Sequence, residues 1–109
     1  MRVAVLDLGT NTFNLVVAEG EKYDFSLIHS SKLPVKLGEG GIHRSTLTQQ
    51  AFDRGVASIE EHYHTLTKLN VDRIKAYGTS ALRSAQNGSE FLETIMMKTG
   101  IEVEIIDGD

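Results

Sequence analysis

The chain lacks cysteine altogether and contains a single proline, Pro34, among its 109 residues. Without cysteine it forms neither a disulfide framework nor a metal site with thiolate ligands. Long apolar runs are also missing, because stretches such as residues 15–18 (LVVA) fall far short of the roughly 20 residues that a membrane-spanning helix requires. The sequence therefore predicts no spanning helix and no disulfide.

The N-terminus has none of the architecture of a signal peptide. Arg2 leads directly into a short apolar run, and an acidic residue, Asp7, follows it almost at once. A signal peptide would instead show a longer apolar region before its cleavage site. We therefore expect a cytoplasmic location.

An excess of positive charge is absent as well. The 11 lysines and arginines stand against 15 acidic residues, which gives a formal net charge of -4. This balance disfavours a protein that binds duplex DNA through its phosphates. A small anionic ligand stays possible, because backbone amides and a metal ion can hold a phosphate on an acidic protein.

The composition is ordinary for a folded domain. Hydrophobic residues make up 40% of the chain and charged residues 24%, which argues against disorder. A chain of this length buries one core, and no repeat, low-complexity segment or linker interrupts it. We expect one α/β unit.

The hydrophobic pattern predicts five strands. They are expected at residues 2–8, 13–18, 23–30 and 71–78, with a fifth over residues 101–105. Two helices are predicted between them. The first begins at a capping box formed by Thr46 and Gln49 and runs to about residue 70, with an apolar stripe of Phe52, Val56, Ile59, Tyr63 and Leu66.

The second predicted helix has an apolar face of Phe91, Leu92, Ile95 and Met96 and ends at Gly100 as its C-cap. Thr79 is expected to cap a short helical turn before it. The resulting order, β-β-β-α-β-α-β, predicts an α/β fold with a five-stranded mixed sheet. Because the last strand has no helix after it, we expect a cover helix to be missing and the chain to be part of a longer protein.

The segment from Asp7 to Thr12 (DLGTNT) carries the first candidate chemistry. Gly9 lets the backbone turn, the N–H groups and hydroxyls of Thr10, Asn11 and Thr12 can donate to a phosphate, and the carboxylate of Asp7 can hold Mg²⁺. An ordinary hairpin turn has the same composition. On local composition alone, that plainer interpretation is favoured.

A second junction lies at residues 78–83 (GTSALR), where a strand passes into a helix. Free N–H groups and the hydroxyl of Thr79 could meet an anion there, and Arg83 could neutralise charge on a transferring phosphoryl group. A solvated surface arginine is an equally good interpretation. Asn87 could be only the cap of the next helix.

The four histidines make poor candidates for a metal site. His62 and His64 are two residues apart on the first helix and so face different ways, whereas His29 and His43 are isolated. The glycine-rich segment at residues 38–41 lacks the strand-then-helix context of a dinucleotide-binding fingerprint. We interpret it as a surface loop.

Taken together, four motifs resemble those of the exopolyphosphatase and guanosine pentaphosphate phosphatase family. They are residues 7–13 (DLGTNTF), 36–40 (KLGEG), 78–83 (GTSALR) and 87–88 (NG), followed by the strand at 102–106 (EVEII). Each is weak alone, but their order and spacing make the resemblance specific, and it covers the whole chain.

The resemblance implies a ribonuclease-H-like domain of the actin, sugar-kinase and heat-shock ATPase superfamily. Residues 1–109 would be the N-terminal part of the first actin-like domain, without a second domain. Asp7 would organise the catalytic Mg²⁺, Gly9 to Thr12 would form the first phosphate loop with Thr79, and Arg83 would contact the substrate phosphate. Asn87 would help to shape the site.

The implied reaction is hydrolysis of a terminal phosphoanhydride, releasing orthophosphate from polyphosphate or from guanosine pentaphosphate. The resemblance places the glutamate that activates water just after residues 106–108, outside the chain, so we expect the 109 residues alone to be inactive. The intact protein is expected to be a homodimer that binds polyphosphate or guanosine penta- and tetraphosphate, and neither DNA nor a membrane.

Three residues depart from the family pattern. Thr10 and Thr12 replace serines and keep the hydroxyls, Asp107 replaces a usual serine, and Asn14 stands where many members carry His or Arg. The loss of a cation at Asn14 leaves the choice between polyphosphate and nucleotide open. Two other functions also stay open: a sugar or acetate kinase of the same superfamily, and a non-catalytic phosphate or nucleotide sensor.

Overall fold

A computed structural model describes residues 1–37 and 46–106, except for the side chains of residues 81 and 83. Its elements follow the order β1 (Arg2–Leu8), β2 (Thr12–Glu21), β3 (Asp24–Pro34), α1 (Gln49–Lys68), β4 (Arg73–Thr79), α2 (Ser80–Ser84), α3 (Gly88–Thr99) and β5 (Val103–Ile106). The predicted β-β-β-α-β-α-β order is confirmed, and α2 is the short helical turn that was expected after the fourth strand. None of the helices in these ranges is long and apolar enough to cross a membrane.

The five strands form one mixed sheet in the order β3-β2-β1-β4-β5. β1, β2 and β3 form an antiparallel meander, whereas β4 and β5 run parallel to β1. The parallel return from β1 to β4 requires a long crossover, which α1 supplies. The predicted five-stranded mixed sheet is therefore confirmed.

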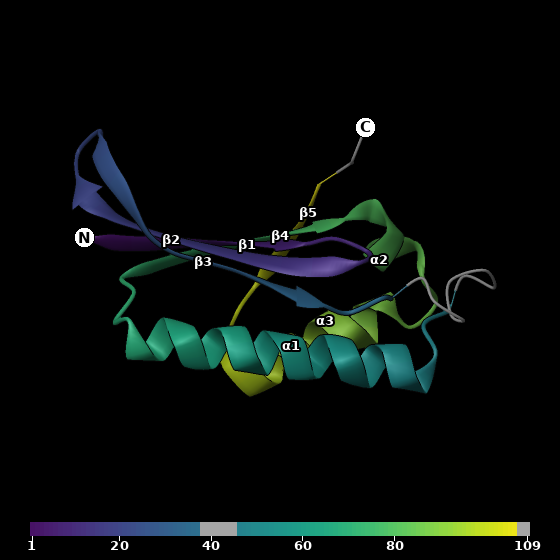
Figure 1. Cartoon of the computed structure of the whole chain (residues 1–109). Coiled ribbons are helices and arrows are strands. Elements are labelled where there is room, and N and C mark those ends of the chain that lie inside the picture. Colours follow the sequence, from purple (N-terminus) through teal and green to yellow (C-terminus); the bar gives the residue numbers. More distant parts are fainter. Residues whose placement is uncertain (38–45, 107–109) are drawn as a thin grey trace.

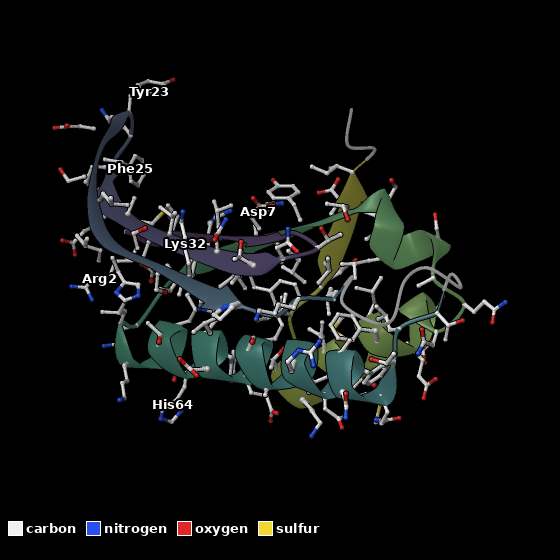
Figure 2. All side chains as sticks on the ribbon, turned by 45° about the vertical axis from the view of Figure 1, so that its right-hand side comes forward. Arg2, Asp7, Tyr23, Phe25, Lys32 and His64 are labelled. Atoms are coloured by element: carbon white, nitrogen blue, oxygen red, sulfur yellow. The ribbon has the colours of Figure 1, made fainter. Side chains whose placement is uncertain are left out.

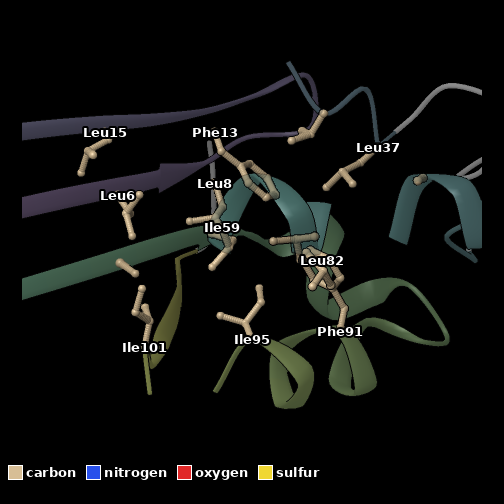
Figure 3. Packing of buried hydrophobic residues seen from close by; sticks show 14 of the residues in the cluster. Leu6, Leu8, Phe13, Leu15, Leu37, Ile59, Leu82, Phe91, Ile95 and Ile101 are labelled. Carbon is tan, nitrogen blue, oxygen red and sulfur yellow. The ribbon is translucent and has the colours of Figure 1, made fainter. Parts of the chain in front are cut away.

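The two longer helices, α1 and α3, lie together on one side of the sheet (Figure 1). The core fills the space between these layers (Figure 3) and includes Leu6, Leu8, Phe13, Leu15, Ile59, Phe91 and Ile95, each at most 1% exposed. Because side chains alternate along a strand, every second residue of β1 and β2 points away from the helices. That side, here called the open face, is not covered by any described element.

The predicted start of α1 needs a correction. The N-cap is Thr48, whose side chain accepts a hydrogen bond from Ala51 N at 3.1 Å, whereas the hydroxyl of Thr46 donates to Gln86 Oε1. Capping at Thr48 lets Leu47 enter the core at 2% exposure, in the position where a residue before the cap packs on the first turn. The predicted end of α3 is confirmed, since its C-cap Gly100 has φ +75°.

Candidate functional site

The turn between β1 and β2 is closed by its own backbone. The N–H of Gly9 donates to the carbonyl oxygen of Thr12 at 3.1 Å, so Gly9 shapes the turn and its N–H is already used. The N–H groups of Thr10 and Asn11 donate to no partner in the described part of the chain. The predicted phosphate loop is thus a hairpin turn that keeps two amide donors free for a ligand.

A second segment fixes the other side of this turn. Beyond the end of β3, Val35 N and Lys36 N donate to Asn11 O at 2.8 and 3.1 Å, and Leu37 N donates to Thr10 O at 2.7 Å. Val35 and Leu37 are fully buried, which anchors the segment in the core. The carbonyl groups of Thr10, Asn11 and Thr12 are therefore bound, while the N–H groups of Thr10 and Asn11 have no partner among the described residues.

Asp7 lies next to the turn on the open face of the sheet, away from α1 (Figure 2). Its neighbours Leu6 and Leu8 are both fully buried, and the alternation along β1 leaves the carboxylate of Asp7 exposed. Among the described residues it forms no ion pair, since the two salt bridges found there join Met1 to Glu21 and Arg2 to Glu19. The carboxylate is free to bind a cation.

One row of polar side chains crosses the whole open face at the level of Asp7. The strand register places one residue from each strand in this row, in the order Lys32, Asn14, Asp7, Tyr77 and Glu104. We call it the polar row. The Oδ1 atom of Asn14, beside Asp7, is buried and has no hydrogen-bond partner in the part of the chain that the structure describes.

The polar row contains oxygen atoms of the kind that bind Mg²⁺. In residues 1–37 and 46–106, no group of three or more His, Cys, Asp or Glu side chains could hold a metal by itself. Mg²⁺ is, however, usually bound by one or two carboxylates together with water and substrate phosphates. The Asp7 carboxylate, with the unpartnered oxygen of Asn14 beside it, fits an ion of that kind.

The end of β4 lies beside the end of β1, because the parallel register pairs Gly78 with Leu8. Thr79 and the start of α2 therefore lie at the same edge of the sheet as the Gly9 to Thr12 turn. The expected cap by Thr79 is wrong, since its Oγ1 is buried without a hydrogen-bond partner among the described residues. Arg83 belongs to α2, and its side chain lies outside the described part of the structure.

Asn87 immediately precedes α3 but makes no side-chain cap bond. Its amide instead joins the backbone of Leu47 twice: Oδ1 accepts from Leu47 N at 2.9 Å, and Nδ2 donates to Leu47 O at 3.0 Å. Asn87 thus ties the start of α3 to the start of α1. Each end of its amide thus makes one hydrogen bond to the backbone of Leu47.

Of the histidines, His62 has a role that the sequence did not indicate. It is 1% exposed, and its Nε2 lies 2.8 Å from the carbonyl oxygen of Phe13, the residue that follows the turn. Burial lowers the pKa of His62 below its usual value, against opposing effects of the Phe13 carbonyl and of Glu61. The neutral ring therefore donates from Nε2 to Phe13.

The other histidines lie apart from the turn. His64 is exposed on the side of α1 that faces away from the sheet (Figure 2). His29 Nε2 lies 3.2 Å from Ser31 Oγ in β3. His43 and the glycine-rich segment at residues 38–41 fall outside the described residues, and so do Asp107 and Gly108.

Sequence comparison relates the chain to a family of phosphatases. The model of the Ppx/GppA phosphatase family matches residues 15–109. The exopolyphosphatase 1 of Mycobacterium tuberculosis is 27% identical over 110 residues, which cover 100% of this chain and 32% of that protein. The chain thus spans about a third of the length of the curated relatives that it matches.

Comparison with solved structures also finds members of this family. An exopolyphosphatase from Cytophaga hutchinsonii superposes with a TM-score of 0.93 at 34% identity, over 99% of this chain and 35% of the other. RuvC from Thermus thermophilus superposes with a TM-score of 0.59 at 14% identity, over 98% of this chain and 63% of RuvC, which shows a shared ribonuclease-H-like fold and nothing more. Because the family match spans all but the first 14 residues, the chain belongs to the Ppx/GppA phosphatase family.

Proposed function

We propose that the intact protein hydrolyses terminal phosphoanhydride bonds and releases orthophosphate from inorganic polyphosphate, from guanosine pentaphosphate, or from both. One observation carries the proposal: in the turn after β1, the N–H groups of Thr10 and Asn11 have no partner among the described residues and lie directly beside the exposed carboxylate of Asp7. Amide donors next to a carboxylate that can carry a cation form a site for a metal-bound phosphate.

Within this proposal, the carboxylate of Asp7 holds Mg²⁺, with Asn14 Oδ1 beside it. The ion, when bound, neutralises charge on the phosphoryl oxygens. The N–H groups of Thr10 and Asn11 donate to phosphate oxygens, and the hydroxyls of Thr10, Thr12 and Thr79 lie at the same edge of the sheet. Thr79 Oγ1 has no hydrogen-bond partner among the described residues, and we propose that its hydroxyl donates a hydrogen bond to a phosphate oxygen.

The family resemblance assigns the remaining roles. Arg83 is proposed to contact the transferring phosphoryl group, where a fixed guanidinium stabilises the charge that develops in the transition state. The base that activates water is proposed to be a glutamate that follows this chain in the intact protein. On this account the 109 residues bind phosphate and Mg²⁺ but do not turn over substrate.

Lys32 offers a means of holding a longer substrate. It is exposed, and it lies in the polar row two strands away from Asp7. Neighbouring strands are about 4.8 Å apart, which places the two backbones roughly 10 Å from one another. We propose that Lys32 binds a phosphate further along the polyphosphate chain than the one being released.

The proposal is tested by measuring orthophosphate release from each substrate by the intact protein with Mg²⁺. Release is expected from at least one of them, and Asp7→Asn is expected to abolish it. The matched control is Asp24→Asn, because Asp24 is an exposed carboxylate at the start of β3, next to the hairpin tip at the opposite end of the sheet. Phosphoryl transfer to a sugar without hydrolysis would instead favour a kinase, and phosphate binding without either reaction would favour a sensor.

A further inference from the structure

The peptide plane between Thr10 and Asn11 carries one of the free amide donors. Its carbonyl oxygen, on Thr10, accepts from Leu37 N at 2.7 Å. Because a trans peptide is planar and its C=O and N–H point in opposite directions, this bond directs the N–H of Asn11 away from the segment at residues 35–37. The direction of the donor is thus set by the position of Leu37.

The segment at residues 35–37 has an unusual backbone of its own. Lys36 adopts φ +47°, in the left-handed region, which a side chain with a Cβ atom rarely occupies. It lies between two fully buried residues, Val35 and Leu37. Such a conformation persists only where its surroundings hold it in place.

Arg54 of α1 stabilises this backbone conformation with two hydrogen bonds. Its Nε donates to Val35 O at 2.8 Å, and its Nη2 donates to Lys36 O at 2.9 Å. The planar guanidinium presents these donors in a fixed fork, which a lysine cannot reproduce. Among the described residues Arg54 forms no salt bridge, and its guanidinium bonds to the backbone carbonyls of residues 35 and 36.

We propose that Arg54 is a positioning residue for phosphate binding. It fixes the two carbonyls of residues 35 and 36, the N–H groups of residues 35–37 fix the carbonyls of the turn, and the turn then presents the N–H of Asn11 to the phosphate. Arg54 does not touch the substrate itself. This inference rests on the proposed function of the turn and names the residue that maintains its geometry.

The first test measures kinetics in the intact protein. Arg54→Met keeps most of the aliphatic stem and removes both hydrogen bonds, and it is expected to lower kcat by roughly tenfold or more, since small misplacements of a binding group are costly. Arg54→Lys is expected to restore little of this loss. The matched control is Arg2→Met, because Arg2 also donates to a backbone carbonyl, Leu69 O at 2.6 Å, and to Glu19, at the other end of the sheet.

The melting temperature separates positioning from a general loss of stability. Arg54→Met and Arg2→Met are expected to lower Tm by similar amounts, whereas only Arg54→Met lowers kcat. Equal kcat values for these two variants would overturn the inference. If Arg54→Met does not fold, the same comparison is made with Arg54→Lys, for which wild-type kcat at unchanged Tm would also overturn it.

The second test needs no catalysis. Inorganic phosphate with Mg²⁺ is titrated into the 109-residue chain, and the amide resonance of Asn11 is followed by NMR. A shift in the wild type that is lost or much weakened in Arg54→Met is expected. If this result is obtained but the intact protein hydrolyses neither substrate, the proposed function is contradicted and the positioning role of Arg54 stands. If the Asn11 resonance does not shift with phosphate, or shifts equally in Arg54→Met, the inference is overturned.

Discussion

His62 Nε2 lies 2.8 Å from the carbonyl oxygen of Phe13. This hydrogen bond joins α1 to the start of β2, just after the Gly9 to Thr12 turn. Together with the bonds from Arg54 to residues 35 and 36, it means that α1 holds the backbone on both sides of the turn. Helix α1 therefore positions the backbone around the turn in addition to covering one face of the sheet.

The stability of the fold is expected to fall as the pH drops below about 6.5, the usual pKa of histidine. Burial lowers the pKa of His62 in the folded state, so the unfolded chain binds a proton more readily. Stability from this group is fully present above the unfolded pKa and is lost as the pH falls toward the folded pKa. Urea unfolding between pH 7.5 and pH 5 measures the effect.

The control for this prediction is two residues away on α1. His62→Gln should flatten the pH dependence in that range, whereas His64→Gln should leave it unchanged, because His64 is exposed. A wild-type stability that does not change across this range, or an equal effect of the two substitutions, would contradict the role given to burial of His62.

The elements that could be predicted from the sequence are those defined by local patterns. The strand at residues 2–8 and the end of α3 at Gly100 were predicted with their observed bounds, because a short apolar run and a left-handed glycine are local signals. The cap of α1 was predicted two residues early, since Thr46 and Thr48 both precede the helix and only burial of Leu47 distinguishes them.

The parts of the site that could not be predicted depend on long-range contacts. Nothing in the sequence near Val35 indicates that its N–H binds Asn11 or that its carbonyl binds Arg54. His62 was considered only as a metal ligand, and its actual partner, Phe13, is 49 residues away. Asp7 and the turn were predictable because their motif is continuous in the sequence.

Gly88→Ala is expected to destabilise the fold, by about 1–3 kcal/mol or more, as is typical of overpacking. A Cβ atom at Gly88 would overlap the backbone carbonyl of Leu82, and backbone cannot move aside as a flexible side chain can. The adjacent Ser89 is exposed, so Ser89→Ala serves as control and should change stability by less than about 0.5 kcal/mol. Urea unfolding compares them, and similar stabilities for the two variants would contradict the predicted overlap.

Lys32→Met is expected to raise KM for long polyphosphate, by a few-fold, while kcat changes little. Lys32 lies two strands from Asp7 in the polar row, and we propose that it contacts a phosphate away from the bond that is cleaved. Loss of one exposed cation removes modest binding energy, of the order of 1 kcal/mol. Steady-state kinetics at low salt measures this change in KM.

Lys68→Met is the matched control, because Lys68 is exposed in the last turn of α1, on the helical layer. The KM of the Lys68→Met variant should equal that of the wild type. An unchanged KM in Lys32→Met would exclude Lys32 from substrate binding.

The isolated 109-residue chain is expected to self-associate through its open face. Val5 and Val16 are cross-strand partners there, and they are 42% and 39% exposed. Apolar surface that is left in water favours association. Sedimentation equilibrium should show species larger than a monomer, reduced by Val5→Thr with Val16→Thr, and a monomer at all concentrations would contradict the prediction.

Asp7 and the turn beside it are proposed to bind the substrate of a phosphohydrolase, and orthophosphate release by the intact protein tests this most directly. With Mg²⁺ and polyphosphate or guanosine pentaphosphate, the wild type should release orthophosphate, while Asp7→Ala and Arg83→Ala should each lower the rate by orders of magnitude, on the order of 10²-fold or more. Near-normal rates in Asp7→Ala, or no release by the wild type from either substrate, would contradict the account.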